Sequence, residues 1–241
     1  LEYNRGKAEQ YGWDPSWFGC ASFDQILIDE IKKYQSSMGL KADGMCGEGT
    51  FRRIYNERTS DLADAATPKG KDVILCNGNA VPIEWGKVVH WTDKGGLSAK
   101  EGCYRKHSGV RDVDLFVNHW DVCLSSTRCQ SVLDKRGISV HFLLDNDGTI
   151  YQTMDTNDIA WHAGGRDWNN RSIGIEISNA YYTKWQGWYE SRNHGSRPII
   201  KGAKVHGSTL EDHLGFYPVQ LDALKALWKA ISVGHNIPLK T

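Results

Sequence analysis

"ISVHFLLDNDGTIYQ", residues 138–152, consists of two apolar runs separated by an Asn-Asp-Gly sequence. Asparagine, aspartate and glycine tolerate the backbone angles of a tight turn, and apolar runs of this length are typical of strands. The stretch therefore predicts a β-hairpin at the centre of the second half of the chain.

The segments on either side of this hairpin extend the pattern. Strands are predicted at 88–91, at 113–120 and in "RSIGIEIS", residues 171–178. "YPVQLDALKALWKAIS", residues 217–232, has leucines at helical spacing and Pro218 where a first turn accepts it. Strands that alternate with helices predict an α/β fold, with a mixed central β-sheet flanked by helices. Residues 179–216 show no clear period and are interpreted as a long surface insertion.

The first part of the chain has a different, all-α pattern. Ser22 and Gln25 have the spacing of a capping box, and apolar residues then recur at helical spacing until Gly39. A second helix is predicted from about Thr50, and this helical hairpin needs a third helix or a partner surface to bury its apolar side. Residues 60–72 are small and polar. We therefore predict a helical domain over 1–62, a linker over 63–72 and the α/β domain over 73–241.

Composition excludes several classes of protein. The chain has 29 basic and 29 acidic residues and no formal net charge, so no overall field attracts nucleic acid or an anionic membrane. No apolar run approaches the roughly 18 residues of a membrane span, and the polar, aromatic N-terminus, which begins at Leu1, does not resemble a signal peptide. Six cysteines without a CxxC pair favour reduced thiols, although Cys123 and Cys129 are close enough in sequence to pair.

Two polar residues interrupt the predicted strands. Val113, Leu115 and Val117 form the apolar line of their strand, and His119 continues it where an aliphatic residue is expected. Glu176 stands among isoleucines, where a carboxylate is costly unless it is paired or serves chemistry. One alternative explanation is that His119 is a structural histidine. An alternative explanation for Glu176 is an ion pair with Arg171.

The helical part closely resembles a known module. "IKKYQSSMGLKADGMCGEGTFRRI" resembles the peptidoglycan-binding repeat of bacterial and phage cell-wall hydrolases, in the positions Tyr34, Gln35, Gly39, Leu40, Asp43, Gly44, Gly47 and Thr50. The resemblance implies that residues 1–62 bind bacterial peptidoglycan.

Four motifs carry a second resemblance, over roughly residues 85–235. "FVNHWDV", "RGISVHFLLDNDGTIYQ", "IAWHAG" and "NNRSIGIEIS" resemble, in order and spacing, the zinc-dependent N-acetylmuramoyl-L-alanine amidases that include phage endolysins and peptidoglycan recognition proteins. The resemblance implies Zn²⁺ as cofactor, His119 as a metal ligand and Glu176 as the residue that activates water. Some relatives use a tyrosine before the hairpin histidine instead, but this chain has Val140 there. The implied substrate-binding residues are Trp161, His162, Asn170 and Arg171.

The chain departs from this family in its metal ligands. The family takes its second and third ligands from the segment after the long helix, which here ends nine residues before Thr241 if it stops at Ser232. The preferred expectation is that these ligands lie beyond Thr241. The alternative is that His90, His206, His213 or His235 completes the site.

The sequence thus predicts an enzyme that cleaves the amide bond between N-acetylmuramic acid and L-alanine in peptidoglycan. Non-catalytic peptidoglycan binding and a structural role in a phage tail or baseplate, among other virion proteins, are the alternatives. A glycosidase is a third, although no carboxylate pair stands out. The expected location is the host cytoplasm with release to the cell wall, or the virion.

Overall fold

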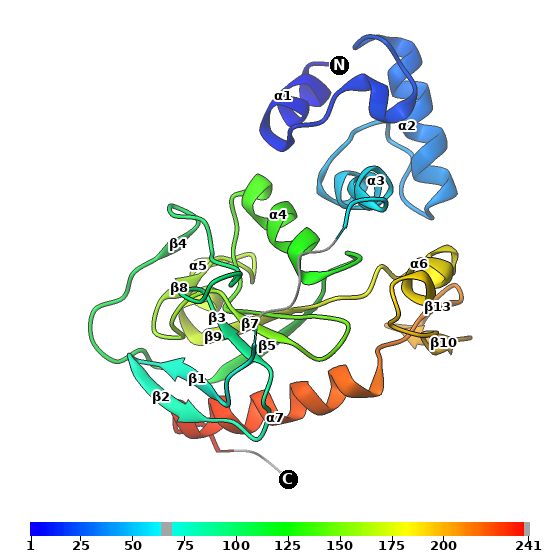
Figure 1. The fold of residues 1–241 in the computed structure, drawn as a ribbon. Coiled ribbons are helices and arrows are strands. Elements are labelled where there is room, and N and C mark those ends of the chain that lie inside the picture. Colours follow the sequence, from blue (N-terminus) through cyan, green and yellow to red (C-terminus); the bar gives the residue numbers. More distant parts are fainter. Residues whose placement is uncertain (64–68, 239–241) are drawn as a thin grey trace. The chain divides into compact units, whose positions relative to one another are not determined.

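The computed structural model describes residues 1–63 and 69–238, and the chain divides into two compact units, residues 1–62 and 63–241 (Figure 1). Part of the predicted linker 63–72, residues 64–68, lies outside the described residues. Lys71 already belongs to the second unit, because its backbone exchanges two hydrogen bonds with Val88. In the described part of the chain, no helix is long and apolar enough to cross a bilayer.

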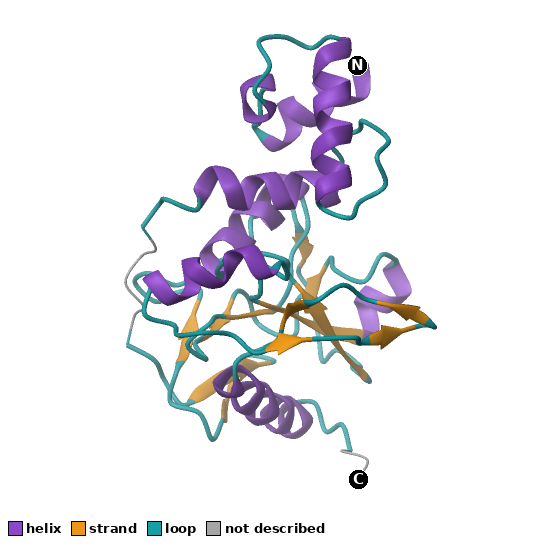
Figure 2. Ribbon diagram, turned by 90° about the vertical axis from the view of Figure 1, so that its right-hand side faces the viewer, coloured by secondary structure: helices purple, strands orange, loops and turns teal. Residues whose placement is uncertain are grey.

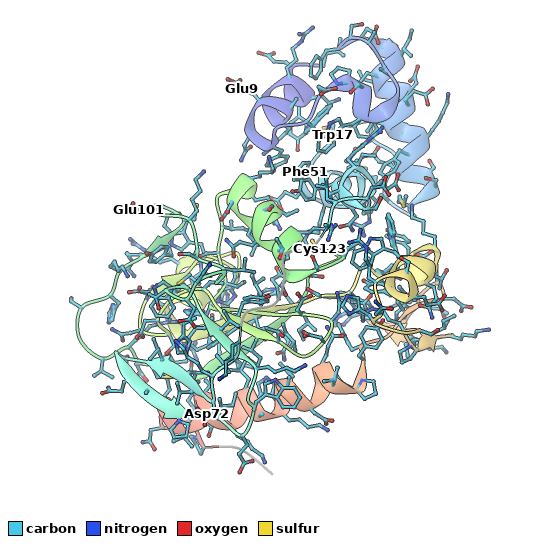
Figure 3. The ribbon with its side chains drawn as sticks, in the orientation of Figure 1. Glu9, Trp17, Phe51, Asp72, Glu101 and Cys123 are labelled. Atoms are coloured by element: carbon cyan, nitrogen blue, oxygen red, sulfur yellow. The ribbon has the colours of Figure 1, made fainter. Side chains whose placement is uncertain are left out.

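The first unit is helical, as predicted. It contains α1 (Glu2–Tyr11), a short 3₁₀ helix η1 (Pro15–Phe18), α2 (Gln25–Ser37) and α3 (Glu48–Thr59). The sequence pattern did not reveal α1, which supplies the third helix that the α2–α3 pair requires. Trp17 stacks on Phe51 in this unit, with 6.2 Å between ring centroids (Figure 3).

The start of α2 differs from the predicted capping box. The N-cap is Asp24, whose carboxylate accepts from the backbone N–H of Leu27 at 3.1 Å. Ser22 lies two residues too early to cap, and its hydroxyl instead donates to the Asp24 carboxylate at 2.6 Å. The cap goes to the residue directly before the first helical turn because only that position faces the open N–H groups.

The second unit is built on a five-stranded mixed sheet, which confirms the predicted fold class. The strand order is β3-β7-β6-β9-β5, where β3 is Val88–His90, β5 Leu115–Trp120, β6 Phe142–Leu144, β7 Ile150–Gln152 and β9 Ser172–Ile177. Strands β6 and β7 form the predicted antiparallel hairpin, whereas β5 and β6 both run parallel to β9.

Helices cover both faces of this sheet (Figures 1 and 2). Helix α7 (Pro218–Gly234), predicted from its periodicity, lies on one face, and α4 (Ser126–Arg136), which was not predicted, lies on the other. The main core lies between α7 and the sheet, where Ile173, Ile175 and Ile177 of β9 contact Leu224 and Leu227. The residues of β9 that alternate with these isoleucines therefore point to the α4 face.

Strand β5 places its residues in the opposite way from that expected. Phe116, not the line of Leu115 and Val117, reaches the core under α7, where its ring meets Trp228 edge-on at 6.0 Å. Leu115, Val117 and His119 alternate with Phe116 and therefore lie on the α4 face, whereas Val113, which precedes β5, belongs to the core under α7. Because β5 is an edge strand, these three residues need less burial than residues of a central strand.

Short elements complete the second unit. They are β1 (Val73–Cys76), β2 (Asn79–Pro82), β4 (Tyr104–Arg105), β8 (Ile159–Ala160), α5 (Arg166–Arg171), η2 (Thr183–Trp185), α6 (Gln186–Ser191), β10 (Ile199–Ile200), β11 (Lys204–Val205), β12 (Ser208–Thr209) and β13 (His213–Leu214). The segment 179–216 is anchored by Arg197, whose guanidinium lies 4.2 Å from the ring centroids of both Tyr189 and Tyr217. This anchor is a tertiary contact, which explains why the segment has no period of its own.

Candidate functional site

His119 and Glu176 lie side by side on the α4 face of the sheet. Strands β5 and β9 are parallel, and their register places His119 directly opposite Glu176. Registered partners on neighbouring strands project to the same face, so the imidazole and the carboxylate share one surface. Glu176 is buried, with 5% of its surface exposed, and His119 is half-buried.

A second histidine joins this pair from a loop. His162 follows β8, and its Nδ1 lies 3.0 Å from Nε2 of His119, with the two rings perpendicular. On its other side, Nε2 of His162 lies 3.2 Å from the hydroxyl of Ser172. Burial, together with His119 and Arg111, lowers the pKa of His162 to about 3, so this ring is neutral.

The four predicted substrate-binding residues occupy different places. Trp161 and Asn170 line an open groove of about 470 Å³ beside α5, and Arg171 lines an adjoining hollow of about 350 Å³. His162 turns its ring to the sheet and is not among the residues that line either one. Arg171 forms its ion pair with Asp114, not with Glu176, so the alternative of an Arg171–Glu176 pair is wrong.

The groove contains basic and amide groups that the sequence reasoning did not single out. Arg105 and Arg166 flank it, and Arg105 donates to the side-chain oxygen of Asn170 at 2.9 Å. Trp161, which is 38% exposed, lines the same groove and offers an aromatic face. An exposed ring beside guanidinium and amide donors suits a ligand that has both a flat apolar surface and anionic or amide groups.

Arg111 was also missed, because nothing in its local sequence distinguishes it from a surface arginine. Its side chain is buried and donates to the backbone oxygens of Asn170 at 3.0 Å and Asp158 at 2.5 Å. It also donates to Thr156, Asn169 and Ser172 oxygens. One guanidinium thus fastens the end of α5 and the start of β9 to the loop before β8.

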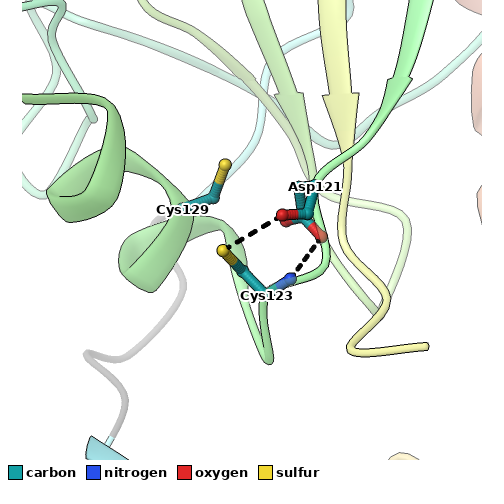
Figure 4. Close-up of side chains that lie close together, drawn as sticks. All are labelled: Asp121, Cys123 and Cys129. Carbon is teal, nitrogen blue, oxygen red and sulfur yellow. Dashed lines mark hydrogen bonds between the residues drawn. The ribbon is translucent and has the colours of Figure 1, made fainter. Parts of the chain in front are cut away.

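Asp121, Cys123 and Cys129 form a buried group next to the end of β5 (Figure 4). The Cys123 backbone N–H donates to the Asp121 carboxylate at 2.8 Å, and its thiol lies 3.4 Å from the Asp121 backbone oxygen. Burial raises the pKa of the Cys129 thiol well above its usual range. The Asp121 carboxylate also accepts from the Ser178 hydroxyl at 3.1 Å and the Asn179 N–H at 3.0 Å, so the group ties the turn between β5 and α4 to the end of β9.

The alternative zinc ligands lie elsewhere. His90 is on the opposite edge strand and contacts the Val73 oxygen, and His235 contacts Thr156. His213 stacks on Tyr181, and His206 is exposed in the β11–β12 turn. Among residues 1–63 and 69–238, no group of three histidine, cysteine or acidic side chains with ligand atoms within 4.8 Å of one another includes His119.

Comparisons with known proteins gave one family match and several similar structures. The sequence profile of the N-acetylmuramoyl-L-alanine amidases matches residues 86–241, about two thirds of the chain. No curated protein sequence matches the chain. Among solved structures, the amidase AmiD from E. coli is 22% identical, with a TM-score of 0.37, and the match covers 60% of this chain and 55% of AmiD. The chain thus spans little more than half of that protein.

Two further structures have similar values. The endolysin LysCS from Clostridium intestinale is 19% identical, with a TM-score of 0.36 and coverage of 63% of this chain and 76% of LysCS. PGRP-Hd from Alvinella pompejana is 18% identical, with a TM-score of 0.35 and coverage of 62% and 80%.

The family match, rather than these structural likenesses, defines the class of protein. A mixed sheet with helices on both faces, and a histidine opposite a buried glutamate, forms the framework on which the matched region is built. The chain belongs to the N-acetylmuramoyl-L-alanine amidase family.

Proposed function

We propose that the second unit hydrolyses the amide bond between N-acetylmuramic acid and the L-alanine of the stem peptide, with zinc as cofactor. The observation that carries this proposal is the pairing of His119 with Glu176 across β5 and β9, within the region that matches the amidase family. A potential metal ligand and a potential proton acceptor thus lie on one face of one rigid sheet.

The donor chemistry of this face fits zinc in part. His119 offers an imidazole at the end of a strand, a ligand type that zinc prefers, and the neighbouring Glu176 offers a carboxylate that could accept a proton from water. Catalytic zinc sites use about three protein ligands. We propose that the remaining ligands come from outside the described residues. When bound, zinc would supply Lewis-acid chemistry, which polarises a carbonyl and lowers the pKa of water.

The side chains of this unit would then have two separate roles, proton transfer and substrate binding. Glu176, which is buried and lies opposite His119, accepts the proton of the attacking water and delivers it to the leaving amine of alanine. Trp161 and Asn170 hold the substrate in the groove, and the guanidinium groups of Arg105 and Arg166 attract its carboxylates. Rigid placement of both reactants supplies much of the expected rate enhancement.

The first unit would act as an anchor on the polymer. Its resemblance to the peptidoglycan-binding repeat supports this role, which raises the local concentration of the hydrolase at the wall without changing its chemistry. We further propose that the protein is a phage lysin that reaches the wall from the host cytoplasm or from the virion.

One observation favours a second candidate, a protein that binds peptidoglycan without cutting it. Within the described residues, His119 is part of no three-ligand group, so the metal site there is incomplete. A wall-binding or virion-structural protein would need the groove but no metal.

One variant tests the assignment of the base, and measurements on the wild type distinguish the two candidates. Glu176→Gln in the intact protein should retain bound zinc, measured by mass spectrometry of the metal, and should release stem peptides from purified sacculi at least about 100-fold more slowly. Glu101→Gln, at an exposed position, is the matched control and should keep wild-type turnover. Full activity of the Glu176 variant would refute the assignment of the base. Wild-type protein that binds sacculi but holds no zinc and releases no peptide would establish the second candidate.

A further inference from the structure

The hydrogen bonds around His162 determine which of its nitrogens carries the proton. The Ser172 hydroxyl lies 2.6 Å from the Trp168 backbone oxygen, which has no hydrogen, so the single hydroxyl hydrogen must lie between them. Ser172 can then only accept from His162, at 3.2 Å. The proton of the neutral His162 ring is therefore on Nε2, and its Nδ1 has the lone pair.

The same reasoning determines which nitrogen of His119 carries the proton. Since Nδ1 of His162 is an acceptor, Nε2 of His119, 3.0 Å away, must be the donor. In the neutral form that can bind a metal, an imidazole has one N–H and one lone pair, so the lone pair of His119 then lies on Nδ1. The direction of three hydrogen bonds, beginning at a backbone carbonyl, thus selects one nitrogen of His119 for a cation.

The position of His162 is fixed without help from His119. A Cβ atom at Gly174 would lie 2.6 Å from Nδ1 of His162 and 2.7 Å from two of its ring carbons, so the ring lies directly on the glycine backbone. The backbone N–H groups of His162 and Ala163 both donate to the side-chain oxygen of Asn169, at 3.0 and 2.8 Å. Nδ1 of His162, the acceptor, is thus held in place from two sides independently of His119.

We propose that His162 is a positioning residue that fixes the tautomer and ring orientation of His119, so that His119 presents Nδ1 to a divalent cation. Partners of this kind orient a ligand and improve its basicity. The inference rests on the proposed function only in naming the cation. It replaces the predicted substrate-binding role of His162, whose ring faces the sheet and not the groove.

The test has a readout in the metal-free protein. In protein labelled with ¹⁵N-histidine, long-range proton–nitrogen correlations should show the His119 proton on Nε2. His162→Phe, which fills similar space but has no acceptor, should abolish this preference and weaken Zn²⁺ binding, measured against a fluorescent chelator, by roughly 10- to 100-fold. His162→Asn returns an acceptor oxygen near the Nδ1 position and should restore the tautomer and most of the affinity.

Two further variants keep the test decisive if the phenylalanine variant does not fold. Ser172→Ala removes the acceptor for His162 and should give mixed tautomers at both histidines, whereas His206→Phe, at an exposed turn, should change nothing. A His119 proton on Nδ1 in the wild type, or an unchanged tautomer and Zn²⁺ affinity without the His162 acceptor, would overturn the proposal. A wild-type protein with the expected tautomer but no amidase activity would instead refute only the proposed function.

Discussion

Arg111 lies against His141 in the interior of the second unit. Nη1 of Arg111 is 3.0 Å from Nε2 of His141, yet no hydrogen bond joins these two nitrogens. The backbone N–H of Gly174 donates to Nδ1 of His141 at 3.1 Å, so the ring proton is on Nε2 and points to the Asp158 oxygen at 3.0 Å. Both facing nitrogens are therefore donors. Burial and the neighbouring guanidinium hold the pKa of His141 well below its usual range, and its ring stays neutral.

Replacing Arg111 should destabilise the second unit strongly. Arg111→Met keeps most of the volume but leaves several buried backbone oxygens without their donor, and each such oxygen costs about 1–3 kcal/mol. We expect a loss of at least about 3 kcal/mol in the free energy of unfolding, measured by urea denaturation. Arg166→Met, at an exposed site, is the control and should lose little. Equal stability of the two variants would show that the Arg111 contacts are replaced by water.

Acid should destabilise the second unit through His235. Burial, helped by Arg111, lowers the pKa of His235 to about 4, although Asp155 acts in the opposite direction. In the unfolded chain this pKa is about 6.5. Between these values the unfolded state binds a proton that the folded state does not, so stability falls as the pH drops through this window.

A variant isolates this contribution. His235→Gln can keep the hydrogen bond to Thr156, present at 2.7 Å, but cannot titrate. Its melting temperature should fall less than that of the wild type between pH 7 and pH 4.5, in thermal scans followed by circular dichroism. His206→Gln, at an exposed turn, should retain the full wild-type drop. Parallel curves for the wild type and the His235 variant would contradict the prediction.

The groove predicts a binding effect separate from chemistry. Trp161→Ala removes the exposed aromatic face and should raise KM for muropeptide release about tenfold with little change in kcat, because stacking contributes to binding before and during the reaction alike. Trp161→Phe keeps a flat ring and should stay within about threefold of the wild type. A fall in kcat without a change in KM would place Trp161 in the reaction itself.

In the first unit, Gln35 should be essential to the loop between α2 and α3. Its buried amide nitrogen lies 3.0 Å from oxygens of Asp43, Thr50 and the Met45 backbone, which share its two N–H groups, and its amide oxygen accepts from the Gly44 N–H at 2.8 Å. Gln35→Ala should expose residues 38–47 to faster hydrogen exchange and cost this unit about 2 kcal/mol. Gln25→Ala, on the exposed side of α2, should leave that exchange unchanged. Wild-type protection of the loop in the Gln35 variant would disprove this role.

Local patterns in the sequence were sufficient for the framework. The Asn-Asp-Gly turn between apolar runs predicted β6 and β7, and the leucine spacing predicted α7, because turn chemistry and periodicity act over a few neighbouring residues. Helix α1 was missed because it packs mainly through small and polar residues, with Asn4, Ala8 and Tyr11 buried, and lacks an apolar stripe.

The site needed more than local patterns. By itself the sequence determined that a histidine and a glutamate stand in apolar strands, and the four-motif resemblance pointed to the family that the profile match then showed. Only the tertiary structure decided that β5 pairs with β9 so that His119 faces Glu176, that His162 packs on Gly174, and that Arg111 is buried. Strand order, register and burial depend on contacts between residues far apart in the chain, and those contacts exist only once the whole sheet has formed.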